Sequence, residues 1–438
     1  MPHELNKILI CPSQPDYEKS LERFRSKMKR AAHFADYGSQ ENQQVIDIIR
    51  DVAEHGDRAV AEYTEKFDGV KLKPDEFRVS QEELDRAHRQ IDQEILLCLR
   101  EAIENVRAYQ KDVLIDTDNA PRGIRYTPIK RIGVCVPGAS APLPSTVIMT
   151  VVPAQVAGVK EIAVVSPPRY EGSIHPVILA VCCELGVNEV YRIGGAQAVA
   201  ALAVGTETIS KVDKIVGPGN KWVQAAKKNV AGDYVGIESI AGPSEVLIIA
   251  NEQANPAWIA ADMLSQAEHA ADSSAVVLTD SEPFAKLILG ELQQQLVGLP
   301  RAKAAKESLT MHSAVIVLED MAGAIEMADD FACEHLEVQC GQESREIAEK
   351  INNAGAIFIG SYSPVAVGDY WAGPSHTLPT GTRAKFASAL TSNDFLKSIS
   401  IVEYDQEMLA ASAEDIIRLA EIEGLSAHAN SVRIRQQE

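Results

Sequence analysis

The sequence lacks the features that would place it in a membrane or mark it for secretion. Residues 1–12 contain no basic start followed by an apolar stretch, so we do not expect a signal peptide. The longest apolar stretch, residues 147–159, is interrupted by polar residues and a proline. No membrane-spanning helix is therefore expected. The sequence has no internal repeat and no low-complexity linker.

Cysteine and basic residues are also scarce. The seven cysteines include no C-x-x-C pair, which is typical of reduced thiols in the cytoplasm rather than of a disulfide framework or a cysteine zinc site. Lys and Arg number 42 against 62 Asp and Glu, a formal net charge of −20. Surfaces that bind nucleic acid or anionic membranes need clustered basic residues, so we expect neither partner. Any anionic ligand must be held locally, by helix N-termini and backbone N–H groups.

Common nucleotide-binding and hydrolase motifs are missing. The nearest approach to G-x-G-x-x-G is Gly217-Pro218-Gly219, where Trp222 stands in place of the third glycine. The sequence also contains no G-x-x-x-x-G-K-[ST] loop, H-E-x-x-H helix or G-x-S-x-G elbow. The absence of these motifs leaves the function open.

The patterns that are present predict an α/β fold. The 438 residues, 46% of them hydrophobic, suffice for two to four domains. Residues 43–109 have helical periodicity, with a capping box at Ser80 and Glu83. From Arg131 onward, short apolar runs alternate with segments of helical length, which is typical of parallel sheets covered on both faces. The expected strands are 132–136, 161–165, 190–193, 214–216, 245–250, 275–278, 314–318 and 356–359.

We predict two Rossmann-like parallel-sheet domains, a helical N-terminal segment and a helical C-terminal tail. The N-terminal segment is 1–40. The first α/β domain combines 41–135 with 245–385, the second is 136–244 on the nucleotide side, and the tail is 386–438, in which we expect no strand. Glycine and proline cluster at 137–139, 194–195, 217–220, 242–244 and 373–375. Because the carboxyl ends of parallel strands face the ligand crevice, these turns indicate a ligand site, although each alone could be a simple tight turn.

Four residues could form a metal site. Gln266 and His269, three apart near the end of a helix that starts at Asn255-Pro256, can face one ion, although such a pair is more often a capped helix end. Asp369 lies in a glycine-rich loop and could be an oxygen ligand or a turn cap.

The fourth residue of this set lies in the tail. Gly424 should end a helix after Glu423, which places His428 in the first turn of the next helix, behind a Ser426 cap. The dipole there favours the neutral imidazole that a metal requires, although a surface tail is equally compatible. Together the four side chains form an N/O set suited to Zn²⁺, with Mn²⁺ or Co²⁺ as substitutes.

Glu334 and His335 are candidates for acid–base chemistry. They follow a helical stretch, residues 321–333, and can both reach into a crevice, one as acid or base and the other activating water. An ordinary exposed pair would have the same sequence.

Several longer runs carry a resemblance to a known family. Taken in order, they closely resemble histidinol dehydrogenase from about residue 40 to about residue 435. The runs are Glu65-Lys-Phe-Asp-Gly69, Asp213-Lys-Ile-Val-Gly-Pro-Gly-Asn220, Ala241-Gly-Pro-Ser-Glu-Val-Leu247, Leu264-Ser-Gln-Ala-Glu-His269, Glu334-His-Leu336, Gly368-Asp-Tyr370, Gly373-Pro-Ser-His-Thr-Leu-Pro-Thr380 and Glu423-Gly-Leu-Ser-Ala-His428.

The resemblance implies a cytoplasmic enzyme with one zinc ion per subunit that uses NAD to oxidise L-histidinol, through the aldehyde, to L-histidine. It also implies a homodimer in which the tail completes the partner's site. The zinc ligands it implies are Gln266, His269, Asp369 and His428, which also lie against the substrate, and the catalytic pair is Glu334 and His335. Further substrate contacts fall on Ser244, His335, His376 and Glu423, and nucleotide contacts on Cys135, Gln197 and Asn220.

Two departures from the family pattern concern these contacts. The usual Tyr-x-Pro-Gly-Gly is Cys135-Val-Pro-Gly-Ala139, and the usual Gly-Pro-Asn-His has Ser375 before His376. Alternatives are a related NAD-dependent dehydrogenase of another small polar alcohol, such as sulfopropanediol, or a metal-dependent hydrolase. A non-catalytic metal-binding paralogue is disfavoured because the catalytic pair and the four ligand positions are intact.

Overall fold

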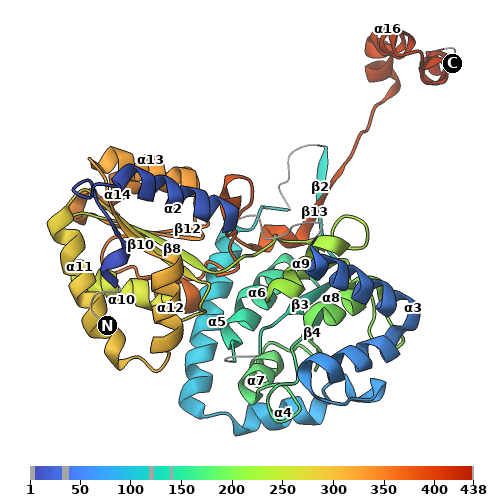
Figure 1. The fold of residues 1–438 in the computed structure, drawn as a ribbon. Helices are drawn as coiled ribbons and strands as arrows, with labels where there is room; N and C mark the ends of the chain where they lie inside the picture. The colour runs from blue at the N-terminus through green and yellow to red at the C-terminus, as the bar shows by residue number, and fades with distance from the viewer. Residues whose placement is uncertain (1–4, 32–38, 118–122, 139–141, 437–438) are drawn as a thin grey trace. The chain divides into compact units, whose positions relative to one another are not determined.

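The computed structural model describes residues 5–31, 39–117, 123–138 and 142–436 (Figure 1). The chain divides into two compact units. The first contains residues 1–114 and 128–395, and the second contains 115–127 and 396–438. The first unit holds two parallel sheets, which confirms the predicted α/β class.

The larger sheet has six strands in the order β1-β10-β9-β8-β11-β12, every neighbouring pair parallel. Helices α10, α11 and α12 pack in the apolar core on one face, and α2, α13 and α14 pack in the core on the other. The strands are β1 (Leu9–Ile10), β8 (Glu245–Ala250), β9 (Ser274–Thr279), β10 (Ala314–Val317), β11 (His335–Gln339) and β12 (Ala356–Ile359). The helices are α2 (Tyr17–Ala31), α10 (Pro256–Ala267), α11 (Glu282–Gln295), α12 (Ala302–His312), α13 (Met321–Phe331) and α14 (Ser344–Ala348).

The smaller sheet has five strands in the order β5-β4-β3-β6-β7, again all parallel. Helices α3, α8 and α9 share one core with it, and α4 to α7 pack against one another. The strands are β3 (Arg131–Cys135), β4 (Glu161–Val165), β5 (Glu189–Tyr191), β6 (Lys214–Val216) and β7 (Gly236–Ile237). The helices are α3 (Gln40–Asp68), α4 (Gln81–Gln90), α5 (Gln93–Val113), α6 (Pro144–Ala157), α7 (Pro176–Glu184), α8 (Gly195–Val204) and α9 (Lys221–Val230).

Strand pairing corrects the predicted division of the first unit. The strand β3 and the lead-in helices α3 to α5 were predicted to belong with 245–385, but β3 pairs with β4 and β6 in the smaller sheet. The N-terminal segment is likewise not separate, because β1 pairs with β10 and α2 packs on the larger sheet.

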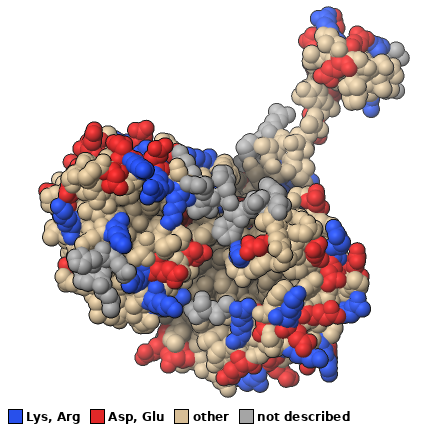
Figure 2. Space-filling model, in the orientation of Figure 1, with Lys and Arg blue, Asp and Glu red and all other residues tan. Residues whose placement is uncertain are grey.

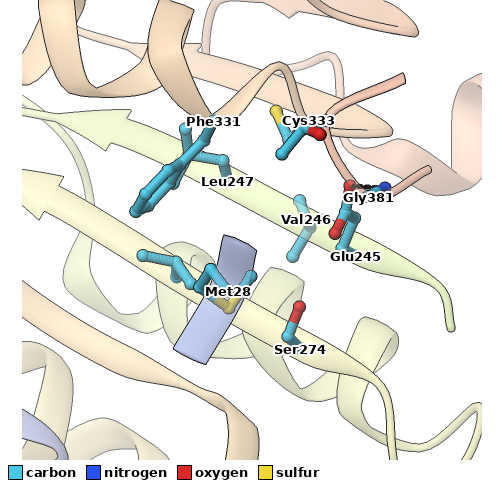
Figure 3. A pocket seen from close by; sticks show the side chains of 10 residues that line it. Met28, Glu245, Val246, Leu247, Ser274, Phe331, Cys333 and Gly381 are labelled. Carbon is cyan, nitrogen blue, oxygen red and sulfur yellow. Dashed lines mark hydrogen bonds between the residues drawn. The ribbon is translucent and has the colours of Figure 1, made fainter. Parts of the chain in front are cut away.

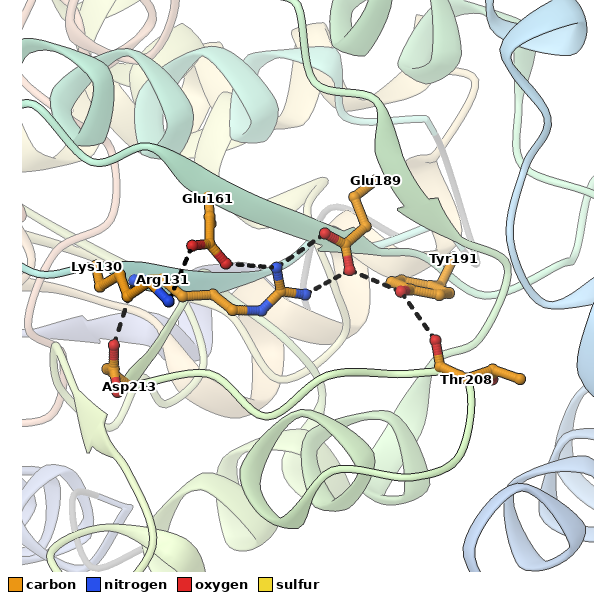
Figure 4. A network of polar contacts seen from close by, with 7 residues as sticks. All are labelled: Lys130, Arg131, Glu161, Glu189, Tyr191, Thr208 and Asp213. Carbon is orange, nitrogen blue, oxygen red and sulfur yellow. Dashed lines mark hydrogen bonds and ion pairs between the residues drawn. The ribbon is translucent and has the colours of Figure 1, made fainter.

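The amino ends of the smaller sheet are joined by a polar network (Figure 4). The Arg131 guanidinium donates to the carboxylates of Glu161, at 3.4 Å, and Glu189, at 2.9 Å, and the Tyr191 hydroxyl donates to Glu189 at 2.7 Å. Arg131, Glu161 and Glu189 are the first residues of their strands, at the opposite ends from the glycine-rich turns. The network therefore ties β3, β4 and β5 together and leaves the carboxyl ends for ligand binding.

The second unit contains a two-stranded sheet and two helices. Its elements are β2 (Ile124–Pro128), β13 (Leu396–Ser400), α16 (Gln406–Ile422) and α17 (Ser426–Arg433). The expectation that the tail contains no strand was wrong. The five residues of β13 are mostly exposed and contain no apolar run, so no sequence pattern indicated this strand. Gly424 follows α16 with φ 73°, as predicted, but Ser426 is the first residue of α17 rather than its cap.

The surface of the described residues carries mixed charge. On the face seen in Figure 2, Lys and Arg are interspersed with Asp and Glu. None of the described helices combines the length and the apolar composition needed to cross a membrane.

Candidate active site

The candidate site is built from the strand ends of both parallel sheets and from the loops that adjoin them. In the smaller sheet the glycine-rich turns follow the carboxyl ends of β3, β5 and β6, as predicted. In the larger sheet Glu245 and His335 begin β8 and β11, so this sheet contributes its amino edge, contrary to the expectation from the 242–244 turn. Ser375 Oγ donates to the Met149 carbonyl of α6 at 3.0 Å, which fixes the 373–376 loop to the smaller sheet's helices.

Glu334 and His335 are buried, with 6% and 4% of their surface exposed, so the reading as an exposed pair was wrong. The backbone N–H of Glu245 donates to Glu334 Oε2 at 2.9 Å, and the N–H of Glu334 donates to Glu245 Oε1 at 3.1 Å. His335 Nδ1 donates to the Glu245 carbonyl at 3.1 Å, because a carbonyl oxygen can only accept. The Nε2 atom of His335 therefore points into the site as the functional nitrogen.

His335 Nε2 has no hydrogen-bond partner among the described residues and lies 3.7 Å from Asp369 Oδ1. Burial disfavours the charged imidazole, but the negative charges of Glu334 and Asp369 outweigh it and raise the pKa of His335 to about 9. Burial raises the pKa of Glu334 to about 7, although the charge of His335 opposes this. Glu334 can therefore exchange its proton near neutral pH, whereas His335 loses its proton only at a higher pH, where the neutral imidazole can act as a base.

Glu245 fixes this pair and was not singled out in the sequence analysis. Its Oε1 also accepts from the Gly381 N–H at 2.9 Å, as Figure 3 shows. A small cavity of about 20 Å³ lies beside it, lined also by Cys333 and Thr382. Glu245 stands in the Ala241–Leu247 run, but its partner Glu334 is 89 residues away in the sequence, so no local pattern could reveal the contact.

Three of the four predicted metal ligands lie in or just after two helices, α10 and α15 (Val365–Tyr370). Gln266, in the last turn of α10, is buried, and its Nε2 has no partner among the described residues. His269 lies two residues beyond the helix at an exposed position. Partial desolvation lowers the pKa of His269 despite the nearby charge of Asp369, which favours the neutral imidazole.

Asp369, in the last turn of α15, is within electrostatic reach of His269, His335 and His376. Burial opposes its charged form, but the positive charge of His335, 3.7 Å away, prevails and lowers the pKa of Asp369. His376 Nε2 lies 3.3 Å from Ser145 Oγ, and burial lowers its pKa. No group of three His, Cys, Asp or Glu side chains in the described ranges could by itself hold a metal, so the predicted site depends on the Gln266 amide and on His428. Glu423 and His428 belong to the second unit, where Glu423 ends α16 and His428 is in the first turn of α17.

The chain matches known proteins along almost its whole length. The family model described as histidinol dehydrogenase matches residues 33–436. The chain belongs to the histidinol dehydrogenase family. It is 44% identical over 421 residues to histidinol dehydrogenase of Thermosynechococcus vestitus, covering 94% of this chain and 97% of that protein. For the Bacillus subtilis protein the identity is 45% over 409 residues, with coverage of 92% and 95%. The crystal structure of histidinol dehydrogenase from Elizabethkingia anophelis superposes with a TM-score of 0.87 at 36% identity, covering 94% and 96%.

The residues to which the histidinol dehydrogenase resemblance assigns nucleotide contacts follow the strands of the smaller sheet. Cys135 ends β3 and is buried, and burial raises its thiol pKa to about 12, so it is an inert apolar neighbour. Gln197, in the first turn of α8, is fully buried with neither amide atom bonded to a described residue. Asn220 caps α9 by accepting from the N–H groups of Trp222 and Val223 at 3.1 and 3.2 Å. Ala139 lies outside the described residues.

A buried ion pair supports the 217–220 turn and was also missed. Lys227 Nζ donates to Glu238 Oε1 at 2.7 Å and to the Gly217 carbonyl at 3.1 Å. The Gly217 N–H donates to the same Glu238 oxygen at 2.8 Å. Gly217 has φ 106°, and a Cβ there would lie 2.3 Å from the Cys135 carbonyl, so only glycine fits this turn.

Ser244, a predicted substrate contact, immediately precedes β8. Its carbonyl accepts from the Ser274 N–H at 3.0 Å, which holds the 242–244 turn against β9. Ser244 is therefore next in sequence to Glu245, the residue that fixes Glu334 and His335.

Proposed function

We propose that this chain catalyses the NAD-dependent, four-electron oxidation of L-histidinol through L-histidinal to L-histidine, the last steps of histidine biosynthesis. The observation that carries the proposal is the buried pair Glu334 and His335, with His335 Nδ1 held by the Glu245 carbonyl and Nε2 left without a described partner. The family membership supplies the substrate class.

A zinc ion fits the residues present. The buried Gln266 amide has an unpartnered nitrogen, and rotating the amide by half a turn would present its oxygen in that place. A neutral imidazole from His269 and a carboxylate from Asp369 are further ligands that zinc accepts. We assign the fourth position to His428, with one zinc ion per subunit. When bound, zinc would supply a template for the amine and ring nitrogen of the substrate.

The protein's own residues then move the protons. In the first oxidation the neutral form of His335 would accept the hydroxyl proton at Nε2, and NAD⁺, when bound, would supply the acceptor for the hydride from the carbinol carbon. In the second oxidation Glu334 takes a proton from a water molecule while the water oxygen adds to the aldehyde carbon. The hydrated aldehyde would then give up hydride, with a second NAD⁺ as the acceptor. The sum is one alcohol, one water and two NAD⁺ giving one carboxylate, two NADH and three protons.

We place the nucleotide at the carboxyl ends of the smaller sheet. The N-termini of α8 and α9 offer backbone N–H groups to phosphates, which compensates for the net charge of −20 that otherwise repels an anion. The unpartnered amide of Gln197, together with Asn220 and the backbone near Cys135, would contact the cofactor.

We infer a homodimer in which the second unit completes the partner's site with Glu423 and His428. Apolar side chains of this unit are exposed, including Val402 at 83%, Leu419 at 65% and Ile422 at 77%. Exposed apolar surface of this kind favours association. All seven cysteines are free, which suits the cytoplasm in which we place the enzyme.

The test is to incubate zinc-loaded protein with L-histidinol and NAD⁺ and to count NADH formed per histidine. Two NADH per histidine is the expected result. No NADH would overturn the proposal. Turnover of sulfopropanediol or another alcohol alone would select the related dehydrogenase, and cofactor-independent hydrolysis would select the hydrolase.

A further inference from the structure

A stripe of buried polar residues runs along β11 beneath the candidate site. His335, Glu337 and Gln339 alternate with Leu336 and Val338, so the three polar side chains share one face of the strand. That is the face covered by α10, because Glu337 pairs in register with Ile248 of the α10-side core. Glu337 is completely buried in the middle of a parallel sheet, where a carboxyl group is costly unless it is bonded.

Hydrogen bonds link Glu337 directly to α15 and, through Gln339 of its own strand, to α10. Its Oε1 accepts from the Val365 N–H, at the start of α15, at 3.0 Å, and its Oε2 accepts from Gln339 Nε2 at 2.8 Å. The same Gln339 nitrogen donates to Asp262 Oδ2 of α10 at 2.8 Å. Gln339 therefore brings two carboxyl groups together in the interior.

The Gln339 amide nitrogen joins the two carboxyl groups, since it donates a 2.8 Å hydrogen bond to an oxygen of each. Two ionised carboxylates this close together would repel each other. Burial raises the pKa of both groups, and the charge of Asp262 raises that of Glu337 further. The pair therefore holds one proton at neutral pH.

Two of the three elements joined here, α10 and α15, carry proposed zinc ligands, and the third, β11, begins with His335. Asp262 lies one turn before Gln266 on α10, Glu337 lies two residues after His335 on β11, and Val365 lies one turn before Asp369 on α15. Apart from these bonds, α15 is a six-residue helix with no side-chain cap at its N-terminus.

We propose that Glu337 is a positioning residue that, with Asp262, holds α10, β11 and α15 at a fixed spacing and so sets the geometry of the zinc ligands. The inference rests on the proposed function for the identity of the metal. Residues that orient metal ligands typically change metal affinity by about 10–100-fold when they are removed.

The test measures zinc affinity of the full-length protein by competition with a chromophoric chelator, alongside the melting temperature. Glu337→Leu should weaken zinc binding by about 10–100-fold. Glu337→Gln keeps an acceptor for the Val365 N–H but turns an amide nitrogen toward the Gln339 donor, so its zinc affinity should lie between those of wild type and Glu337→Leu. The control Leu292→Ala, which removes a buried side chain of α11, should lower the melting temperature without changing zinc affinity.

Unchanged zinc affinity in folded Glu337→Leu would overturn the proposal, as would Glu337→Gln binding as weakly as Glu337→Leu. If Glu337→Leu does not fold, Asp262→Ala replaces it. Asp262 is only partly buried, and its removal should weaken zinc binding in the same way, with unchanged affinity again overturning the proposal. A wild-type protein that binds no zinc would overturn the metal site itself, a result recognisable before any variant is compared.

Discussion

Glu334 and Glu245 each accept, through a side-chain oxygen, a hydrogen bond from the other's backbone N–H, at 2.9 and 3.1 Å. This reciprocal exchange at the starts of β8 and β11 fixes the carboxyl groups of the half-buried Glu245 and the buried Glu334 on backbone N–H groups. It also leaves the Glu245 carbonyl free to orient His335. The bonds hold each glutamate side chain in one rotamer, so the proposed acid–base pair depends on the Glu245 side chain.

Removing the Glu245 side chain should disable the site. Glu245→Ala leaves the N–H groups of Glu334 and Gly381 without their acceptor, a loss of about 2–5 kcal/mol in the free energy of unfolding. A displacement of about 1 Å in His335 would lower kcat by about 100-fold. Glu245→Gln keeps an oxygen for both N–H groups and should retain most of the activity. Steady-state kinetics and urea unfolding of both variants check this, and equal activity of Glu245→Ala and wild type would contradict it.

The two oxidations should separate in Glu334→Gln. The amide oxygen can still accept from the Glu245 N–H, so the fold should be kept, but the amide cannot take a proton from water. Loss of a general base typically costs about 100–10,000-fold, here in the oxidation of L-histidinal. Oxidation of L-histidinol to the aldehyde depends on His335 and should decrease far less. Single-turnover NADH formation from each substrate measures the two steps, and full aldehyde oxidation by the variant would exclude Glu334 as the base.

Local patterns predicted the elements better than their assembly. The apolar runs located the strands β8 and β9, and Asn255-Pro256 and the Ser80 capping box marked helix starts where the structure has them. The two-residue β1 and the exposed β13 have no such run and were missed.

The assembly depends on contacts that sequence distance conceals. β3 was assigned to the wrong sheet because a strand's apolar run does not identify its pairing partner. The Glu334 and His335 pair was visible as a motif, whereas its burial and its Glu245 support depend on register between β8 and β11. The role of Lys227 was equally hidden, since a helical lysine usually faces solvent.

The Arg131 network should make stability depend on pH. Burial alone would raise the pKa of Glu189, but the hydrogen bonds and charge of Arg131 outweigh burial and hold it below its usual value. The unfolded chain then binds more protons than the folded one near the ordinary pKa of Glu. This stabilisation is present above about pH 4.5 and is lost as the pH falls through the folded pKa.

Arg131→Met should therefore destabilise the protein by about 3–5 kcal/mol at pH 7, because Glu189 loses its buried partner. The penalty should shrink as the pH falls through the lowered pKa of folded Glu189, because below that pH Glu189 is protonated in both states. Urea midpoints at pH 7 and at a series of lower pH values measure this. The control Arg100→Met removes the more exposed pair with Glu184 and should cost at most about 1 kcal/mol. A pH-independent penalty in Arg131→Met would contradict the assignment.

Gly217→Ala should impair nucleotide binding specifically. The new Cβ would lie 2.3 Å from the Cys135 carbonyl, so the 217–220 turn must move. The KM for NAD⁺ should rise by about tenfold or more, since a shift of about 1 Å in a binding group costs that much. Gly232→Ala is the matched control, because Gly232 also has a positive φ, 86°, but open space around its Cβ position. It should cost about 1–2 kcal/mol of stability and leave the KM unchanged. Similar KM values for the two variants would place the nucleotide elsewhere.

Mixed dimers should reveal whether the tail acts across subunits. His428→Ala removes a proposed zinc ligand, and Glu334→Gln removes the proposed base, so each homodimer should fail to form histidine. If the tail serves the partner's site, a mixed dimer has one site with both residues intact, because the His428→Ala subunit keeps its own Glu334 and receives the normal tail. Random mixing of equal amounts should then restore about a quarter of wild-type activity. If each tail serves its own subunit, every site in the mixture lacks one residue and no activity returns. Histidine formation after co-expression of differently tagged subunits distinguishes the two arrangements, and the mixed dimer isolated through both tags should show about half of wild-type activity if the tail serves the partner, and none otherwise.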